Sequence, residues 1–151
     1  MTIGASVLLV AVVAALGLGG WRLATDGRFR GTHRVRGAED TQRPEPADSV
    51  LQETPWEDQL GERATLLQFS SAFCAPCRAT RRVLSEVAEV VPGVVHVEVD
   101  AEHHLDLVRR LGILRTPTTL VLDAAGAEVT RASGAPTRQQ VMAAVERALF
   151  T

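Results

Sequence analysis

Two cysteines stand three positions apart, and this spacing indicates redox or metal chemistry. Cys74 and Cys77 enclose Ala75 and Pro76, and Phe73 precedes them. An expected strand ends just before the pair and an expected helix begins at it, so Cys74 lies where free N–H groups and the helix dipole stabilise a thiolate. The thiolate is the reactive form of cysteine. Two intervening residues bring the second sulfur back to the first within one turn, so a disulfide can form and open there.

The residues around the pair favour the redox interpretation. Pro76 suits the first turn of a helix, because its missing N–H would have no helical partner there. Three arginines add positive charge that favours a thiolate, namely Arg78, Arg81 and Arg82. Half of a zinc site, completed by His103 and His104, is an alternative, and so are two inert buried thiols. We prefer redox chemistry, since both sulfurs stand at a helix start rather than in its apolar stripe.

The segments on either side of the pair alternate between strand and helix patterns. Strands are expected at 65–69, 94–99, 118–122 and 128–131, helices at 74–91, 102–111 and 137–150, and weaker signals indicate a short edge strand at 49–54 and a helical turn at 55–61. In the helix 74–91, apolar residues recur at the spacing of an amphipathic helix. In the strand 94–99, His96 and Glu98 share one face. This order predicts an α/β fold, with a parallel-containing sheet covered by helices.

The chain begins with an apolar segment. Residues Thr2 to Gly20 carry no charged side chain, and they would span roughly 28 Å as a helix, near the lower limit for crossing a hydrocarbon core. We therefore expect a transmembrane anchor at residues 2–21, a flexible linker at 22–49 and the globular domain at 50–151. A cleaved signal peptide and a buried core helix are the alternatives. The first fits less well because no basic residue precedes the segment.

Arginines follow this segment and none precedes it. They are Arg22, Arg28, Arg30, Arg34 and Arg36. The positive-inside rule then predicts a single-pass membrane protein whose carboxyl-terminal domain lies in the cytoplasm. An extracytoplasmic domain is the alternative.

The composition excludes several classes of function. All 16 basic residues are arginine, which excludes a catalytic lysine and a complete Walker A loop. The net charge of −2 does not provide the positive field that nucleic acids need. Hydrophobic residues at 46% and charged residues at 23% are typical of a globular protein. With two cysteines, a disulfide-rich secreted scaffold is also excluded.

From Val50 to Phe150 the sequence resembles the thioredoxin superfamily, and in particular its membrane-anchored bacterial members. The resemblance rests on residues 66–69, 73–77, 97–100 and 112–118 and on Gly134. The Cys-x-x-Cys motif is moderately specific by itself. Thr116-Pro117-Thr118, about 40 residues further on at the start of a strand, makes the combination specific.

The resemblance implies a thioredoxin-like fold and a protein-disulfide oxidoreductase. Cys74 would attack and Cys77 would resolve the mixed disulfide, while a cis Pro117 would face the pair. The residues implied to bind substrate are Phe73, Ala75, Pro76, Thr116 and Pro117. No organic cofactor and no metal are implied. The implied partners are protein thiols and disulfides and a redox donor. The implied oligomeric state is a monomer.

Two positions depart from the family pattern. Gln68 replaces an aspartate that assists proton transfer to the second cysteine, and His96 replaces a nearby lysine. Both are candidates for the proton-transfer step, although Gln68 cannot take a proton and a plain core amide bonded to the backbone is an alternative. For the whole domain, a non-catalytic binding or metal-handling module is the alternative function.

Overall fold

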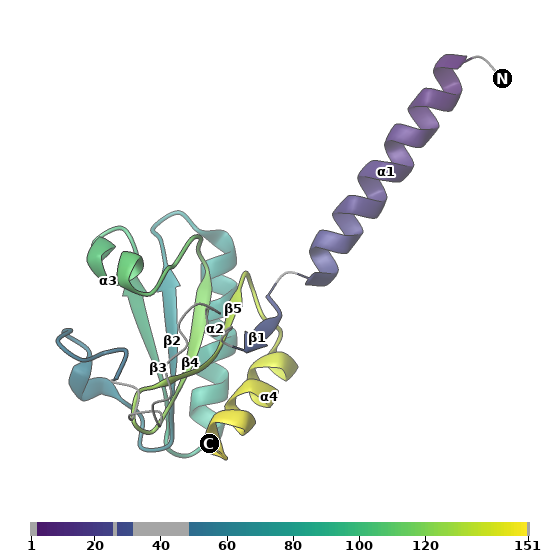
Figure 1. Ribbon diagram of the computed structural model, residues 1–151. Coiled ribbons are helices and arrows are strands. Elements are labelled where there is room, and N and C mark those ends of the chain that lie inside the picture. Colours follow the sequence, from purple (N-terminus) through teal and green to yellow (C-terminus); the bar gives the residue numbers. More distant parts are fainter. Residues whose placement is uncertain (1–2, 26, 32–48, 151) are drawn as a thin grey trace, which may run out of the picture.

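A mixed sheet of five strands forms the centre of the domain in the computed structural model, which describes residues 3–25, 27–31 and 49–150. The strands are β1 (Phe29–Gly31), β2 (Ala64–Ser70), β3 (Val94–Asp100), β4 (Thr118–Asp123) and β5 (Glu128–Ser133). Their order across the sheet is β1-β5-β4-β2-β3 (Figure 1). Only β2 and β3 run parallel among these described pairs. The predicted α/β fold with a parallel-containing sheet is confirmed.

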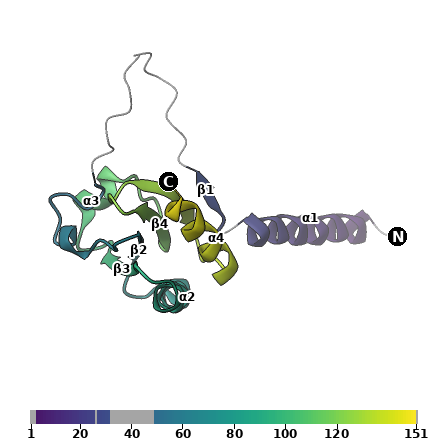
Figure 2. The same ribbon diagram turned by 90° about the horizontal axis from the view of Figure 1, so that it is seen from below.

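Helices cover both faces of this sheet. They are α1 (Ile3–Thr25), α2 (Ala75–Val90), α3 (Leu105–Arg110) and α4 (Arg138–Leu149), with a 3-10 turn η1 (Glu57–Gln59). Helices α2 and α4 lie side by side on one face and α3 lies on the other, whereas α1 extends away from the domain (Figures 1 and 2). The sheet is therefore the middle layer of three.

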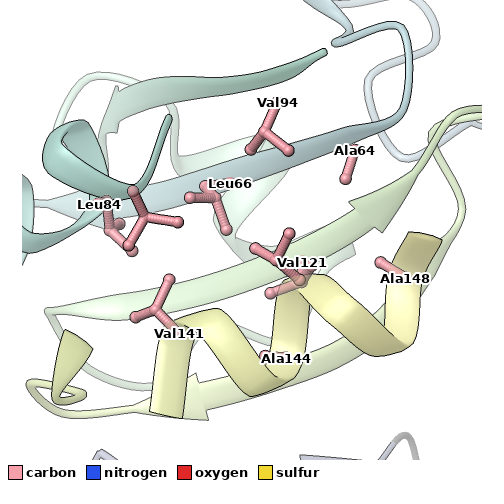
Figure 3. Packing of buried hydrophobic residues seen from close by; sticks show 10 residues of the cluster. Ala64, Leu66, Leu84, Val94, Val121, Val141, Ala144 and Ala148 are labelled. Carbon is pink, nitrogen blue, oxygen red and sulfur yellow. The ribbon is translucent and has the colours of Figure 1, made fainter. Parts of the chain in front are cut away.

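Two apolar clusters fix these layers. The first lies between the sheet and helices α2 and α4 (Figure 3), and its members include Leu66, Leu84, Val121 and Val141. The second lies on the α3 face, and its members include Leu51, Phe69, Leu107 and Leu120. Every residue of β2 is buried, and each large apolar side chain removed from water contributes about 1.5–3 kcal/mol. The end of β2 therefore provides a firm base for the loop that follows it.

Helix α2 starts and stops for local reasons. Cys74 is its N-cap with extended backbone, and Pro76 occupies the first turn. The N–H of Cys77 donates to Sγ of Cys74 over 3.1 Å, which satisfies one of the free donors at the helix start. The helix ends before Pro92-Gly93, where Gly93 takes a φ of +79° that glycine adopts readily. The cysteine pair is thus held by the helix start itself.

Three expected elements differ in the structure. The edge strand predicted at 49–54 is wrong: these residues form turns, in which the Thr54 hydroxyl donates to the Leu51 carbonyl over 2.6 Å. The edge beside β5 is instead β1, inside the predicted linker, with Phe29 opposite Ala132. The helix predicted at 102–111 is shorter in the structure, where it is α3. The N–H of Glu102 donates to the carboxylate of Asp100 over 2.9 Å, so the first residues form a turn. The rest of the predicted linker, residues 32–48, lies outside the described residues.

The apolar amino-terminal segment is helical, as α1. Its described leucine and valine side chains are exposed, among them Leu8 at 70% and Leu16 at 71%. Across the described ranges, no helix has both the length and the hydropathy that crossing a membrane requires. The transmembrane part of the predicted architecture is not supported on this criterion.

Candidate functional site

A disulfide joins Cys74 and Cys77 at the amino terminus of α2. Their Cα atoms lie 5.2 Å apart. Cys74 is half-buried, whereas Cys77 is only 2% exposed. This difference follows from the helix, because the first cysteine caps it and the second faces the sheet. An incoming sulfur can therefore reach Cys74 far more easily than Cys77.

The loop before β4 lies against the cysteine loop. The peptide bond between Thr116 and Pro117 is cis, as the resemblance implies. The hydroxyls of Thr116 and Ser71 lie 3.1 Å apart, and the backbone carbonyl of Ser71 accepts from the N–H of Cys74 over 3.3 Å. The structure thus brings together two motifs that are about 40 residues apart in the sequence.

Apolar side chains stand exposed in both of these loops. Phe73 is 100% exposed and Leu114 is 95% exposed, while Ala75 and Pro76 are also exposed. Exposed large apolar side chains beside a reactive group are typical of a surface that meets a partner. Phe73 is one of the predicted substrate-binding residues, whereas Leu114 is not, because no local pattern distinguishes it from the apolar residues next to it.

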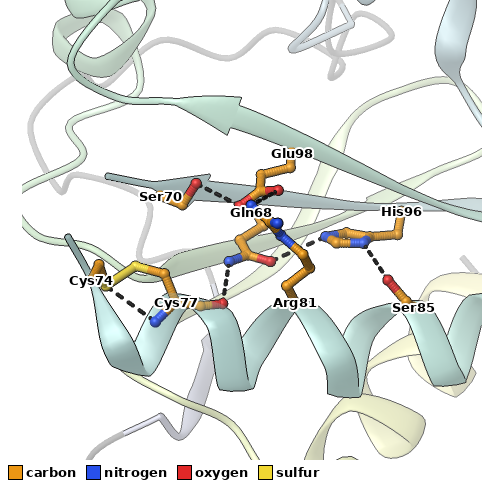
Figure 4. Close-up of polar contacts among 8 residues, drawn as sticks. All are labelled: Gln68, Ser70, Cys74, Cys77, Arg81, Ser85, His96 and Glu98. Atoms are coloured by element: carbon orange, nitrogen blue, oxygen red, sulfur yellow. Dashed lines mark hydrogen bonds and ion pairs between the residues drawn. A yellow bond between two sulfur atoms is a disulfide. The ribbon is translucent and has the colours of Figure 1, made fainter. Parts of the chain in front are cut away.

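A chain of hydrogen bonds runs beneath the disulfide, between the sheet and α2 (Figure 4). The amide nitrogen of Gln68 donates to the carbonyl of Cys77 over 3.0 Å. Nε2 of His96 lies 3.1 Å from the amide oxygen of Gln68, and Nδ1 lies 3.1 Å from the hydroxyl of Ser85. Gln68 is completely buried, and its amide is bonded to the backbone as the core-amide alternative expects. Both predicted proton-transfer candidates belong to this chain.

The nitrogen of His96 that carries the proton can be assigned from the atoms on either side of the ring. An amide oxygen only accepts, so Nε2 of His96 carries the proton and donates to Gln68. Nδ1 then accepts from Ser85. Burial lowers the pKa of His96 below its ordinary value; the Glu98 carboxylate opposes this and the Arg81 guanidinium adds to it. The imidazole is therefore neutral at pH 7.

An ion pair lies beside this chain on the same face of β3. Nη2 of Arg81 lies 2.6 Å from Oε2 of Glu98, and the Ser70 hydroxyl donates to Oε1 of Glu98 over 2.6 Å (Figure 4). Partial burial by itself would raise the pKa of Glu98, but the hydrogen bonds from Arg81 and Ser70 outweigh it and the pKa ends below the ordinary value. Glu98 is thus a carboxylate at neutral pH.

A polar pocket connects this ion pair to the disulfide. Its volume is about 360 Å³, and its lining includes Cys74, Cys77, Arg78, Arg81 and Glu98. The buried sulfur therefore has charged groups of both signs in the same pocket. Glu98 was not among the predicted site residues, although the alternation of β3 puts it on the same face as His96.

The histidines proposed for a zinc site have other neighbours. Nδ1 of His103 lies 2.8 Å from the carboxylate of Asp100, and the ring of His104 meets the ring of Trp56 edge-on with centroids 4.6 Å apart. Among the residues that the structure describes, no group of three or more His, Cys, Asp or Glu side chains could hold a metal ion. The zinc alternative therefore has no support in the geometry.

Known proteins similar in sequence are thioredoxins. The family described as Thioredoxin matches residues 48–147. Rice thioredoxin H5 is 27% identical over 78 residues, which are 48% of this chain and 58% of the relative. Human thioredoxin domain-containing protein 2 is 35% identical over 60 residues, which are 40% of this chain and 11% of the relative. The chain spans less than two thirds of the length of either relative.

Solved structures show the same fold. Thioredoxin F from spinach chloroplast has a TM-score of 0.55 at 23% identity, covering 66% of this chain and 88% of that one. The thioredoxin of Fasciola hepatica has a TM-score of 0.53 at 23% identity, covering 60% of this chain and 86% of that one. The family match extends over well more than half of the sequence and includes the cysteine pair. The chain therefore belongs to the thioredoxin family.

Proposed function

We propose that this protein is a protein-disulfide oxidoreductase that exchanges thiols and disulfides through Cys74 and Cys77. The observation that carries the proposal is the disulfide at the start of α2, with one sulfur accessible and the other buried. A helix start stabilises the thiolate that the exchange requires. Membership in the thioredoxin family supports the same chemistry.

The exchange proceeds in two balanced steps when the protein acts as a reductant. The thiolate of Cys74 attacks a substrate disulfide, a mixed disulfide forms, and one substrate sulfur leaves as a thiolate. The thiolate of Cys77 then attacks Sγ of Cys74, which releases the second substrate sulfur and closes the Cys74–Cys77 disulfide. Two electrons pass to the substrate, and a dithiol donor returns them to the protein. The same steps run backwards when the protein oxidises a substrate.

Protein substrates are the proposed partners. An extended chain could lie against the backbone beside the cis Pro117, in the manner of an added strand. Its apolar side chains would contact Phe73, Ala75 and Pro76, and the backbone of Thr116 would help to hold it. The exposed fractions of Phe73 and Leu114 support a partner with apolar residues near its cysteine. The exchange itself needs no organic cofactor and no metal, and a monomer contains every residue that we assign to it.

The proposal also includes attachment to a membrane through the amino-terminal segment, with the domain on the cytoplasmic side. It is supported by the uncharged run from Thr2 to Gly20 and by the exposed leucines and valines of α1. The arginines that follow the run favour the cytoplasmic side.

Reduction of insulin disulfides with a dithiol donor tests the proposed function. The full chain should accelerate the reaction well above the free dithiol, and Cys74→Ser and Cys77→Ser should each abolish the acceleration. Ser49→Ala, in a loop away from α2, is the control and should keep the activity. A wild-type rate equal to that of the free dithiol would contradict the proposal and favour a non-catalytic binding module on the same fold.

A further inference from the structure

The polar pocket beside the disulfide has the size of a small-molecule site. Its volume is about 360 Å³, and sites for small molecules measure about 300–1,000 Å³. Residues 70–72 form part of its lining, and their side chains are those of serine, serine and alanine. These small side chains at the end of β2 leave space next to both sulfurs. A molecule in the pocket therefore lies against the reactive pair.

One positive charge in this pocket has no partner. Among its four charged side chains, Arg81 and Glu98 pair with each other over 2.6 Å. The carboxylate of Asp100 lies 2.8 Å from Nδ1 of His103. The guanidinium of Arg78 forms no ion pair and no hydrogen bond with any residue that the structure describes. The pocket therefore offers an unmatched cation beside the sulfurs, and an anionic group would complement it.

The pocket differs from the surface that we assign to protein substrates. None of the residues of that surface lines the pocket; they are Phe73, Ala75, Pro76, Thr116 and Pro117. That surface is apolar, whereas the pocket has hydroxyl and charged groups in its wall. Figure 4 shows Ser70, Arg81 and Glu98 from this wall near the disulfide. Two different surfaces thus meet at the disulfide, and a redox cycle has two partners, the substrate and the donor.

We propose that this pocket binds a low-molecular-weight thiol that carries a carboxylate, with the carboxylate at Arg78 and the thiol at Sγ of Cys74. The proposal rests on the thiol–disulfide exchange proposed above and names the chemical class of its redox partner. A guanidinium forms charge-assisted hydrogen bonds with a carboxylate, often two at once. Such a pair holds the small thiol beside the disulfide and so raises its effective concentration there.

The exchange with the small thiol balances in two steps. Its thiolate attacks Sγ of Cys74, a new S–S bond forms between them, and the electron pair of the broken Cys74–Cys77 bond leaves on Sγ of Cys77. The thiolate of a second small thiol then attacks the sulfur of the first, which releases a small disulfide and leaves Cys74 as a thiolate. Each small thiol gives its proton to water. Two molecules thereby supply the same two electrons as one dithiol.

Three thiols test the charge that the pocket prefers, each with two carbons between the sulfur and a variable group. The variable group makes 3-mercaptopropionate an anion, 2-mercaptoethanol neutral and cysteamine a cation. The measurement is the rate constant for opening the disulfide of the full chain at low salt, followed by alkylation and mass spectrometry. Each rate constant is expressed as variant over wild type, which removes the intrinsic differences in reactivity among the thiols.

Arg78→Gln removes the proposed partner of the carboxylate. It should lower the rate constant for 3-mercaptopropionate about three- to fivefold more than that for 2-mercaptoethanol, and the rate constant for cysteamine should fall least. Arg82→Gln is the matched control, because Arg82 is another exposed arginine of α2 and does not line the pocket. It should leave the preference among the three thiols unchanged. Glu98→Gln frees Arg81 for a carboxylate, so it should increase the preference for 3-mercaptopropionate.

Filling the pocket separates binding inside it from attraction at a distance. Ala72→Leu enlarges a side chain of the lining without changing any charge, and it should lower the preference for 3-mercaptopropionate over 2-mercaptoethanol about threefold. Ala79→Leu adds the same side chain on α2 outside the lining and should have no effect. Both alanines are exposed, so both variants should fold, as circular dichroism and urea unfolding will show.

Two results from these rate constants would overturn the proposal. The first is a preference in Arg78→Gln that equals that of the wild type or of Arg82→Gln, because the helix as a whole would then attract the anion. The second is equal preferences in Ala72→Leu and Ala79→Leu, because binding would then not need the pocket.

Insulin reduction with dithiothreitol, an uncharged donor, separates the small thiol from an acidic residue of a protein substrate. Arg78→Gln should keep this activity within about twofold of the wild type. A loss as large as that for 3-mercaptopropionate would assign Arg78 to protein substrates and overturn the proposal. A chain that reduces insulin without any preference among the thiols keeps the proposed function and loses this one. A chain that does not reduce insulin above the free dithiol contradicts the proposed function itself.

Discussion

Arg81 and Glu98 form an ion pair of 2.6 Å in the wall of the pocket that contains the buried sulfur of Cys77. Arg81 comes from α2, and Glu98 comes from β3. Glu98 balances the positive charge of Arg81, which would otherwise stabilise the thiolates more strongly. The two partners should therefore have opposite effects on the reduced dithiol.

Removing the charge of Glu98 and removing the charge of Arg81 should shift the apparent pKa of the two thiols in opposite directions. Glu98→Gln leaves the Arg81 charge unopposed, and it should lower the apparent pKa of the thiols by about 0.3–0.5 unit; Arg81→Gln should raise it by about the same amount. Thiolate absorbance during a pH titration measures both. Arg147→Gln, on α4, is a control that should change neither. Shifts of the same sign in both variants would contradict the electrostatic explanation.

The two cysteines should trap different species. In Cys77→Ser, the accessible thiolate of Cys74 can attack a substrate but nothing resolves the mixed disulfide, so adducts should accumulate. In Cys74→Ser, the remaining thiol is buried and should trap little. Non-reducing gels with mass spectrometry distinguish the two outcomes. Trapping by Cys74→Ser alone would reverse the roles.

Phe73 should matter for protein substrates and not for small ones. Its ring is fully exposed, so Phe73→Ala should cost no stability, while the lost apolar contact should lower kcat/KM for insulin roughly fivefold. Reduction of a small aromatic disulfide should continue at the wild-type rate. The matched control is Phe150→Ala, which removes another exposed ring at the end of α4 and should affect neither reaction. An equal loss for both substrates would place Phe73 in the chemistry instead.

Stability should depend on pH through His96. Its pKa is lowered in the folded state, mainly by burial, so the unfolded chain takes up the proton first as the pH falls below about 6.5. The contribution of neutral His96 to the free energy of unfolding is fully present above that pH. It is lost as the pH falls through the pKa that His96 has in the folded state. The slope stays below about 1.4 kcal/mol per pH unit, the limit for one proton. Urea unfolding of wild type and His96→Gln measures it, and the variant should show the flatter profile over this range.

Membrane attachment and sidedness can be measured in cells. The full chain should sediment with membranes and resist salt extraction, while a chain beginning at residue 27, which keeps β1, should stay in the supernatant. A fluorescent reporter that folds only in the cytoplasm, fused after Thr151, should fluoresce, and an alkaline phosphatase fusion should be inactive. The reverse reporter pattern would place the domain outside. A full chain found entirely in the supernatant would contradict attachment.

Much of the fold and of the reactive pair could be predicted from the sequence, because the patterns that encode them are local. The strand before Ser70 and the helix after Cys74 follow from apolar periodicity within a dozen residues. The placement of Cys74 as helix cap follows from the same boundary. The edge strand at 49–54 was predicted wrongly because a short segment with two adjacent apolar residues is equally compatible with the turns that form there. The true edge strand β1 has three residues and depends on pairing with β5, about 100 residues away in the chain.

The sequence by itself determined which atoms can react, and the tertiary structure decided what surrounds them. Cysteine spacing and helix start are local, so they set the chemistry of Cys74 and Cys77. The partners of the buried sulfur are not local: Glu98 lies opposite Gln68 only because β2 and β3 pair in one register. The partners of the Gln68 amide likewise come from other elements, namely the Cys77 carbonyl on α2 and His96 on β3. Hydrogen bonds between distant segments follow from packing, and no pattern along the chain encodes their geometry.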